Sequence, residues 1–259
     1  MLTVISPAKR LDWADRDVEM TEPRFQSDAG TLARAARRLT QAQLADLMDL
    51  SPALAKLNAD RFRRFAEDRD NTRPAALAFA GDTYMGLEAG SLGVDDLRFA
   101  QDRLRILSGL YGILRPLDAI HAYRLEMGSR LKTRKGPNLY AFWGDRLARA
   151  LNEDAAALGT TTLINCASVE YFSAVNRDAL QLEVITPQFL EDKPGGPKIV
   201  SFFAKRARGA MARFIVERRL TDRDGILDFD AGGYVHAPEL SEPGSPAFLR
   251  SADAAAEAA

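Results

Sequence analysis

The chain has 259 residues, of which 46% are hydrophobic and 27% are charged, with a net charge of −1. These values are typical of a globular protein with enough material for a large core, and they exclude disordered and fibrous chains. No apolar run approaches the ~20 residues that a membrane-spanning helix needs, so we expect a cytoplasmic protein without membrane contact.

The first predicted elements are a strand and three helices. The apolar run Leu2–Ser6 is typical of a buried strand, and Pro7 ends it. Apolar residues at helical spacing predict a helix over residues 28–39. Two more helices are expected to begin at Thr40 and Ser51, because both side chains can cap a helix.

The middle of the chain is expected to be mainly helical. Helix signals run from Asp95 to Leu107 and stop at residues 109–112, which hold two glycines. Residues 113–127 are expected to be partly helical. A further amphipathic helix covers residues 143–158, and Gly159 is suited to end it.

The last third of the chain mixes strands with one long helix. Apolar runs predict strands at Thr161–Asn165, Leu182–Thr186 and Lys198–Phe203. A basic helix follows over residues 205–220, with a buried apolar face and its charges directed outward.

These elements do not alternate as regular strand–helix–strand units. We therefore predict an α+β fold, with a single compact domain over residues 1–235 and a mixed sheet surrounded by helices. Residues 236–259 are acidic and rich in alanine, and we expect them to form a loosely ordered tail.

Few residues are available for thiol or soft-metal chemistry. Cys166 is the only cysteine, and His121 and His236 are the only histidines. We therefore expect no disulfide, no thiolate or histidine-rich metal site and no cofactor. A magnesium site built from carboxylates is left open, because magnesium needs only oxygen ligands. Cys166 follows an apolar run, where a buried inert thiol is expected rather than a peroxidase nucleophile.

The small net charge hides an uneven distribution of charge. Residues 103–135 carry eight Lys or Arg against two acids, and residues 201–223 carry seven against two. From Asp224 onward the sequence has seven Asp or Glu residues, and Arg250 is the only Lys or Arg there. The distribution is compatible with a strong local positive patch, although solvated helix faces would also account for each basic run.

The segment from Leu97 to Met127 resembles a helix-hairpin-helix. In such an element, glycines let backbone N–H groups approach a DNA phosphate while nearby Lys or Arg side chains neutralise its charge. An ordinary turn at the end of a helix is the alternative. The residues expected to bind DNA here are Gly109, Gly112, Arg105, Arg115 and Arg124.

The segment Ser201–Gly209 predicts a second phosphate site. Cations in the first turn of a helix are unfavourable beside the positive end of its dipole, and a bound anion would relieve that cost. The alternative is that Lys205 and Arg206 pair with Glu170 or Asp145. The candidates for binding nucleic acid here are Lys205, Arg206, Arg208 and Arg213, together with Lys9 from the loop after the first strand.

Five separated acids next to small or aromatic residues are candidates for catalysis. They are Asp82, Asp118, Glu126, Asp145 and Glu170. Carboxylates that converge with Lys and Arg could act as general acids and bases or hold magnesium. Each could equally be a helix cap or an ion-pair partner, and the familiar nucleophile, P-loop and zinc motifs are absent.

At these same segments the chain resembles the YaaA family, which is linked to resistance against peroxide stress. The matching stretches are Ile5–Lys9 with Leu11 and Asp12, Phe79 with Gly81, Asp82 and Tyr84–Leu87, Leu107–Gly112 with Leu114–Asp118, Tyr123–Gly128, Phe142–Asp145, Asn165 with Ala167, Ser168 and Glu170–Phe172, and Lys205–Gly209. The resemblance extends to about Tyr234. It implies a cytosolic protein with a helix-hairpin-helix, a basic cleft, and affinity for double-stranded and branched DNA. It also implies a role in limiting damage by the hydroxyl radical that peroxide and ferrous iron generate.

The residues and the resemblance together leave three functions to consider. The favoured one is a peroxide-stress protein that binds duplex or branched DNA through phosphates, without reading its sequence. The alternative is an enzyme that acts on a phosphate-bearing small molecule or nucleic acid, with the acids as bases or magnesium ligands. Direct sequestration of iron is disfavoured by the scarcity of His and Cys. Whether the chain is an enzyme, and its oligomeric state, are left open.

Overall fold

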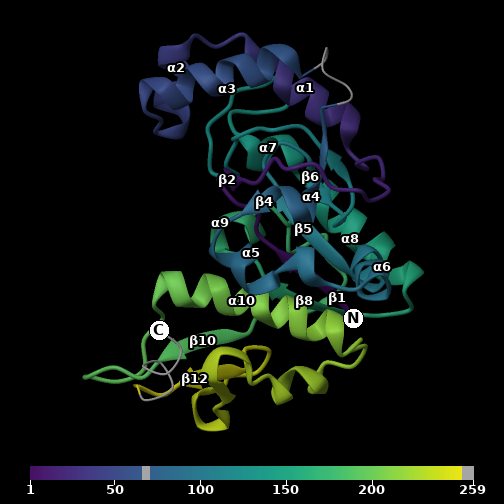
Figure 1. Ribbon diagram of the computed structural model, residues 1–259, viewed down its shortest axis with the longest axis vertical. Coiled ribbons are helices and arrows are strands. Elements are labelled where there is room, and N and C mark those ends of the chain that lie inside the picture. Colours follow the sequence, from purple (N-terminus) through teal and green to yellow (C-terminus); the bar gives the residue numbers. More distant parts are fainter. Residues whose placement is uncertain (66–70, 253–259) are drawn as a thin grey trace.

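The computed structural model describes residues 1–65 and 71–252, and its centre is a five-stranded mixed sheet with the order β6-β5-β1-β8-β9 (Figure 1). In this sheet β1 pairs in parallel with β5 and β8, β8 pairs in parallel with β9, and β6 runs antiparallel to β5. The mixed sheet and its covering helices confirm the predicted α+β class. The strands are β1 (Leu2–Ile5), β5 (Leu104–Ser108), β6 (Gly112–Leu114), β8 (Thr162–Cys166) and β9 (Glu183–Ile185).

The central position of β1 explains its unbroken apolar sequence. Its four residues are all buried, with Leu2, Val4 and Ile5 at 0% exposure. A strand covered on both faces has no solvent side, so its sequence does not alternate between apolar and polar residues. The strand predicted at the start of the chain is therefore confirmed.

Three helices form a separate layer at one end of the molecule, seen in purple and blue at the top of Figure 1. They are α1 (Gln26–Arg37), α2 (Gln41–Met48) and α3 (Pro52–Arg64). The Thr40 hydroxyl accepts a hydrogen bond from Gln43 N (3.2 Å), and Gln43 Oε1 accepts one from Thr40 N (2.9 Å). The Ser51 hydroxyl caps α3 by accepting from Leu54 N (3.4 Å), just before Pro52. Both predicted caps are confirmed.

On the other side of the central sheet, α5 (Asp82–Leu87) packs against the long helix α10 (Ser201–Glu217). Two glycines allow the backbones to touch. A Cβ atom on Gly209 would lie 1.7 Å from the carbonyl oxygen of Thr83, and one on Gly86 would lie 2.0 Å from that of Arg206. No side chain fits at either position, so the two helices are held in one relative position.

A second sheet lies beyond α10, at the bottom of Figure 1. Within the described chain it has the order β10-β12-β11, formed by β10 (Gln188–Glu191), β12 (Ala247–Arg250) and β11 (Tyr234–His236). Residue 236 onward was expected to be loosely ordered, but β12 is the middle strand of this sheet. Phe248 is fully buried, its ring centroid 5.6 Å from that of Phe189, and Arg250 pairs with buried Glu191 at 2.8 Å. Residues 253–259 lie outside the described residues.

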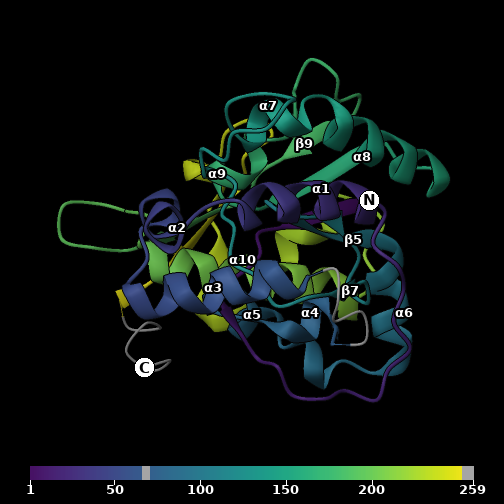
Figure 2. The same cartoon turned by 90° about the horizontal axis from the view of Figure 1, so that it is seen from above.

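Short elements complete the fold. Two-stranded pairs join β2 (Arg10–Leu11) to β4 (Phe79–Ala80) and β3 (Arg73–Pro74) to β7 (Ala119–Ile120). The other helices are α4 (Ala75–Ala78), α6 (Val94–Arg103), α7 (Leu139–Trp143), α8 (Arg146–Ala157) and α9 (Val169–Phe172), with 3₁₀ turns at Ala89–Ser91, Asp224–Asp228, Ala231–Gly233 and Pro238–Leu240. Seen from above, α7 and α8 lie on one side of the molecule and α4, α5 and α6 on the other (Figure 2). None of the helices in the described ranges has both the length and the apolar character needed to cross a membrane.

The predicted helix-hairpin-helix is wrong. The helix before the turn ends at Arg103, and the turn from Ser108 to Gly112 joins the antiparallel strands β5 and β6. Both glycines face the protein interior: Trp143 Nε1 donates to the carbonyl of Gly109 (3.1 Å), and a Cβ on Gly112 would lie 2.8 Å from the Trp143 ring. Buried backbone of this kind cannot reach a DNA phosphate.

Arg105 was predicted to bind DNA, but it lies on β5 with 2% exposure. Its Nε donates to Asp154 Oδ2 at 2.6 Å, and Nη1 donates to the carbonyls of Gln101 and Leu104. Burial lowers the pKa of the guanidinium, and the neighbouring Asp154 opposes that shift. Arg105 is therefore a structural residue that links the sheet to α8.

The strand predicted at Lys198–Phe203 is also wrong. Helix α10 begins at Ser201, so Phe202 and Phe203 occupy its first turn. Only a single bridge, between Lys198 and Glu191, is strand-like. The apolar residues that predicted a strand belong instead to the start of the helix, and Lys205 and Arg206, expected in its first turn, lie beyond that turn.

Replacing Gly209 with alanine should strongly destabilise the protein. The added methyl group collides with backbone of α5, which cannot move as a side chain can, so we expect a loss of ~2–3 kcal/mol or more in the free energy of unfolding. Urea denaturation measures this. The matched control is Gly90→Ala, because a Cβ there meets nothing within 4 Å. Equal stability of the two variants would contradict the close helix packing.

Replacing Asp154 with alanine should leave the Arg105 charge buried without its carboxylate. We expect a loss of about 3–5 kcal/mol in the free energy of unfolding. The control is Asp60→Ala, which removes an ion pair to Arg63, a side chain with 60% exposure, and should cost below ~1 kcal/mol. A small effect for Asp154→Ala in the same urea titration would show that Arg105 is not buried as described.

Candidate functional site

A pocket of about 710 Å³ opens where the carboxyl ends of β1 and β8 meet the beginnings of α5 and α10. Parallel strands next to each other in a sheet leave a crevice at their carboxyl ends, and ligands of α/β proteins commonly bind there. Six residues predicted from the sequence line this pocket: Lys9, Asp82, Glu126, Glu170, Lys205 and Arg208. We call it the strand-end pocket.

The cations of the strand-end pocket come from two parts of the chain. Lys205 and Arg208 stand in the first half of α10, and Lys9 lies in the loop after β1. Lys9 Nζ pairs with Glu126 Oε2 at 2.8 Å. Lys205 and Arg208 form no ion pair within the described part of the chain, so the alternative pairing of Lys205 with Glu170 or Asp145 is not found there.

Arg208 is half-buried, and this burial lowers the pKa of its guanidinium. The group that opposes the shift is the thiol of Cys166, which is neutral at physiological pH. A partly desolvated cation without a carboxylate partner costs free energy, and an anion bound in the pocket would offset that cost.

Three carboxylates line the same pocket. Asp82 is the first residue of α5, and Glu170 lies in the short helix α9. Glu170 Oε1 accepts a hydrogen bond from Gly128 N at 2.9 Å, which ties α9 to the loop that carries Glu126. Among the described residues, no group of three or more His, Cys, Asp or Glu is arranged to hold a metal ion.

Two hydrogen-bonded serines, Ser6 and Ser168, also line the pocket. The Ser6 hydroxyl accepts from Ser168 N at 2.8 Å and lies 3.3 Å from the Ser168 hydroxyl. The Tyr84 hydroxyl donates to the carbonyl of Ser6 at 3.2 Å. Burial raises the pKa of the Cys166 thiol to about 12, so the thiol stays protonated at neutral pH, as expected for an inert cysteine.

Sequence reasoning did not assign Ser6 or Ser168 to the site. The sequence position of each serine nevertheless indicated a place at the site. Ser6 is the first polar residue after a buried apolar strand, and Ser168 is a capping residue that follows the apolar run of β8 and accepts from Tyr171 N. Both therefore stand at strand ends, where side chains of a parallel sheet reach a common crevice.

The other two candidate acids lie elsewhere. Asp118 is buried, accepting from the Thr21 hydroxyl (2.7 Å) and from Arg115 N (2.8 Å), and burial raises its carboxyl pKa. Asp145 accepts from Asn176 Nδ2 at 2.7 Å. These contacts give both acids structural roles away from the strand-end pocket.

The remaining four predicted DNA-binding cations lie in different surroundings. Arg124 donates to Glu126 Oε1 at 3.2 Å and lies at the edge of the strand-end pocket. Arg206 faces a different pocket on the other side of α10, and Arg115 is exposed away from both. Arg213 donates to the carbonyls of Leu87 and Glu88, so it caps the C-terminal end of α5.

The comparisons with known proteins agree on one family. The family model described as "Peroxide stress protein YaaA" matches residues 1–240. A UPF0246 protein of Jannaschia sp. (strain CCS1) is 72% identical over 259 residues and spans 100% of both chains. A UPF0246 protein of Ruegeria pomeroyi is 66% identical over 252 residues, covering 96% of this chain and 98% of the relative. The chain therefore belongs to the YaaA family of peroxide stress proteins.

Proposed function

We propose that the protein acts in the cytosol by holding the phosphate backbone of duplex or branched DNA at the strand-end pocket, and that this limits iron-driven damage to DNA. Membership of the family supports a role in the response to peroxide stress. DNA is a critical target of the hydroxyl radical, so a protein that covers its backbone would contribute directly to resistance.

The observation that carries this proposal is the pair Lys205 and Arg208. Both line a concave pocket without an acidic partner in the described part of the chain, and both stand in the first half of a 17-residue helix. Both lie beyond the first turn of that helix, which begins at Ser201, so their own charges rather than the helix dipole attract the anion. A phosphate is an anion of the size and hydrogen-bonding capacity that such a site favours.

Binding of this kind is expected to be independent of DNA sequence. Lysine and arginine contacts to phosphate fix the position of a protein on the duplex and carry no information about the bases. The exposed Arg10 and the edge residue Arg124 lie near Lys9 and extend the positive surface along the loop side of the pocket.

A second function is favoured by the carboxylates. Asp82, Glu126 and Glu170 line the same pocket as the cations. Phosphate binding alone does not need acids, and they would repel a bound anion. An enzyme that acts on a phosphate-bearing small molecule or nucleic acid would use them as general acid and base, with Lys205 and Arg208 holding the phosphate.

Removing Lys205 and Arg208 should weaken DNA binding and its dependence on salt. We expect Lys205→Ala with Arg208→Ala to make the slope of log affinity against log salt less steep by about 2, because each lost phosphate contact removes roughly one released counterion. Fluorescence anisotropy with a duplex and a four-way junction, between about 50 and 200 mM salt, measures the slope.

The matched control is Lys56→Ala with Arg38→Ala. It removes one lysine and one arginine that are exposed and do not line the pocket. A control that weakens binding as much as the pocket variant would contradict the site. A third variant, Asp82→Asn with Glu170→Gln, removes two carboxylates that would repel phosphate, so DNA binding should be retained or tightened. Failure of the native protein to bind DNA at low salt would favour the enzyme instead.

A further inference from the structure

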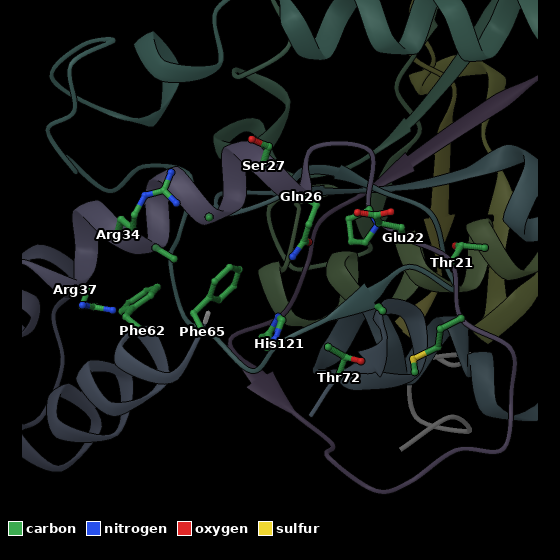
Figure 3. A pocket seen from close by; sticks show the side chains of 15 residues that line it. Thr21, Glu22, Gln26, Ser27, Arg34, Arg37, Phe62, Phe65, Thr72 and His121 are labelled. Carbon is green, nitrogen blue, oxygen red and sulfur yellow. The ribbon is translucent and has the colours of Figure 1, made fainter. Parts of the chain in front are cut away.

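A second cavity lies between the layer of helices α1–α3 and the body of the protein, and no function discussed above uses it. Its volume is about 660 Å³, within the range of small-molecule sites. The close view in Figure 3 shows its walls, with side chains from α1 on one side and aromatic rings from α3 and the loop after β7 on the other. We call it the interlayer cavity.

One wall of the interlayer cavity is aromatic and rigid. Phe62 and Phe65 come from the end of α3, and the centroid of the Phe65 ring lies 4.6 Å from that of His121. The imidazole of His121 is itself held in place, because the Tyr111 hydroxyl lies 3.2 Å from its Nδ1 and 3.0 Å from its backbone N. Phe65 and His121 keep only 8% and 9% exposure, so a planar aromatic group would pack against the small open part of these rings.

A side chain that carries an unsatisfied hydrogen-bond acceptor lies opposite this wall. Gln26, the first residue of α1, points into the cavity toward Phe65 and His121 in Figure 3. Its side-chain oxygen Oε1 is buried and has no hydrogen-bond partner among the described residues. A buried acceptor that is left unsatisfied costs free energy, and a donor on a ligand would remove that cost.

Two positive charges border the cavity on the α1 side. Arg34 and Arg37 stand in the last turn of α1, where the helix dipole favours cations. Arg34 donates to the Thr31 hydroxyl, and Arg37 has no ion pair within the described ranges. Glu22 lies across the cavity from them in Figure 3, which places opposite charges at opposite ends.

We propose that the interlayer cavity binds a small planar aromatic acid that carries a hydrogen-bond donor. The ring packs beside Phe65 and His121, the acid meets Arg34 and Arg37, and a rotation of the Gln26 amide brings its buried Oε1 to the donor. The donor end then faces Glu22, so one orientation of the ligand is favoured. This site shares no lining residue with the strand-end pocket, so its variants leave the residues proposed to hold DNA unchanged.

The experiment is isothermal titration of the whole protein with three probes that meet this description: indole-3-acetate, tryptophan and 4-aminobenzoate. We expect saturable binding of at least one. For indole-3-acetate the matched compounds are tryptophol, which lacks the acid, and 1-methylindole-3-acetate, which lacks the N–H donor. If indole-3-acetate binds, the Kd of each matched compound should be about tenfold higher or more. Tryptophol loses the charge-assisted hydrogen bond of the acid, and 1-methylindole-3-acetate loses the buried hydrogen bond of the N–H donor.

Two variants assign the binding to this cavity. Gln26→Met keeps the size of the side chain and removes the unsatisfied oxygen, so its melting temperature should equal or exceed that of the native protein while the probe's Kd rises about tenfold or more. Arg37→Gln should weaken binding similarly, whereas Arg38→Gln, which changes the neighbouring exposed arginine outside the cavity, should not. Failure of all three probes to saturate, or equal binding to the native protein and both cavity variants, would overturn the proposal.

Discussion

The contact between α5 and α10 is the constraint on which the strand-end pocket depends. Gly86 and Gly209 bring the two backbones into direct contact, and no larger residue fits at either position. Because this contact fixes the two helices relative to each other, their N-terminal halves are held beside the carboxyl ends of β1 and β8. Asp82, Lys205 and Arg208 therefore line one pocket whose shape is set by backbone packing. The sheet forms the crevice, and the contact between α5 and α10 places charged side chains along it.

Burial divides the charged residues of the chain into two kinds. Arg105 and Arg250 are deeply buried, and each is paired with a carboxylate, Asp154 or Glu191, so their charges are satisfied within the protein. Arg208 is half-buried and has no such partner in the described chain. The net charge of the chain does not distinguish buried cations that are paired from those that are not. A site for an external anion is indicated by a cation that burial has partly desolvated and that the fold has not paired.

Much of the fold could be predicted from the sequence, because β1, β8 and the caps at Thr40 and Ser51 depend on local residues. The helix-hairpin-helix could not be excluded, since buried strand β5 has apolar residues at positions that also suit a helix. Positions at strand ends and helix starts indicated several residues that line the strand-end pocket. Only tertiary packing shows that these residues lie in one pocket, whereas Asp118 and Asp145 lie outside it. The interlayer cavity had no sequence signal, because it forms between layers that are far apart along the chain.

The most direct test of the phosphate site is the side-chain Nε–Hε signal of Arg208 in a ¹⁵N NMR spectrum, followed while a short DNA duplex is added at low salt. We expect this signal to shift and saturate with the duplex, whereas the signal of Arg105, already bonded to Asp154, stays in place. A duplex that binds the protein without moving the Arg208 signal would contradict the assignment of the strand-end pocket as the place where phosphate is held.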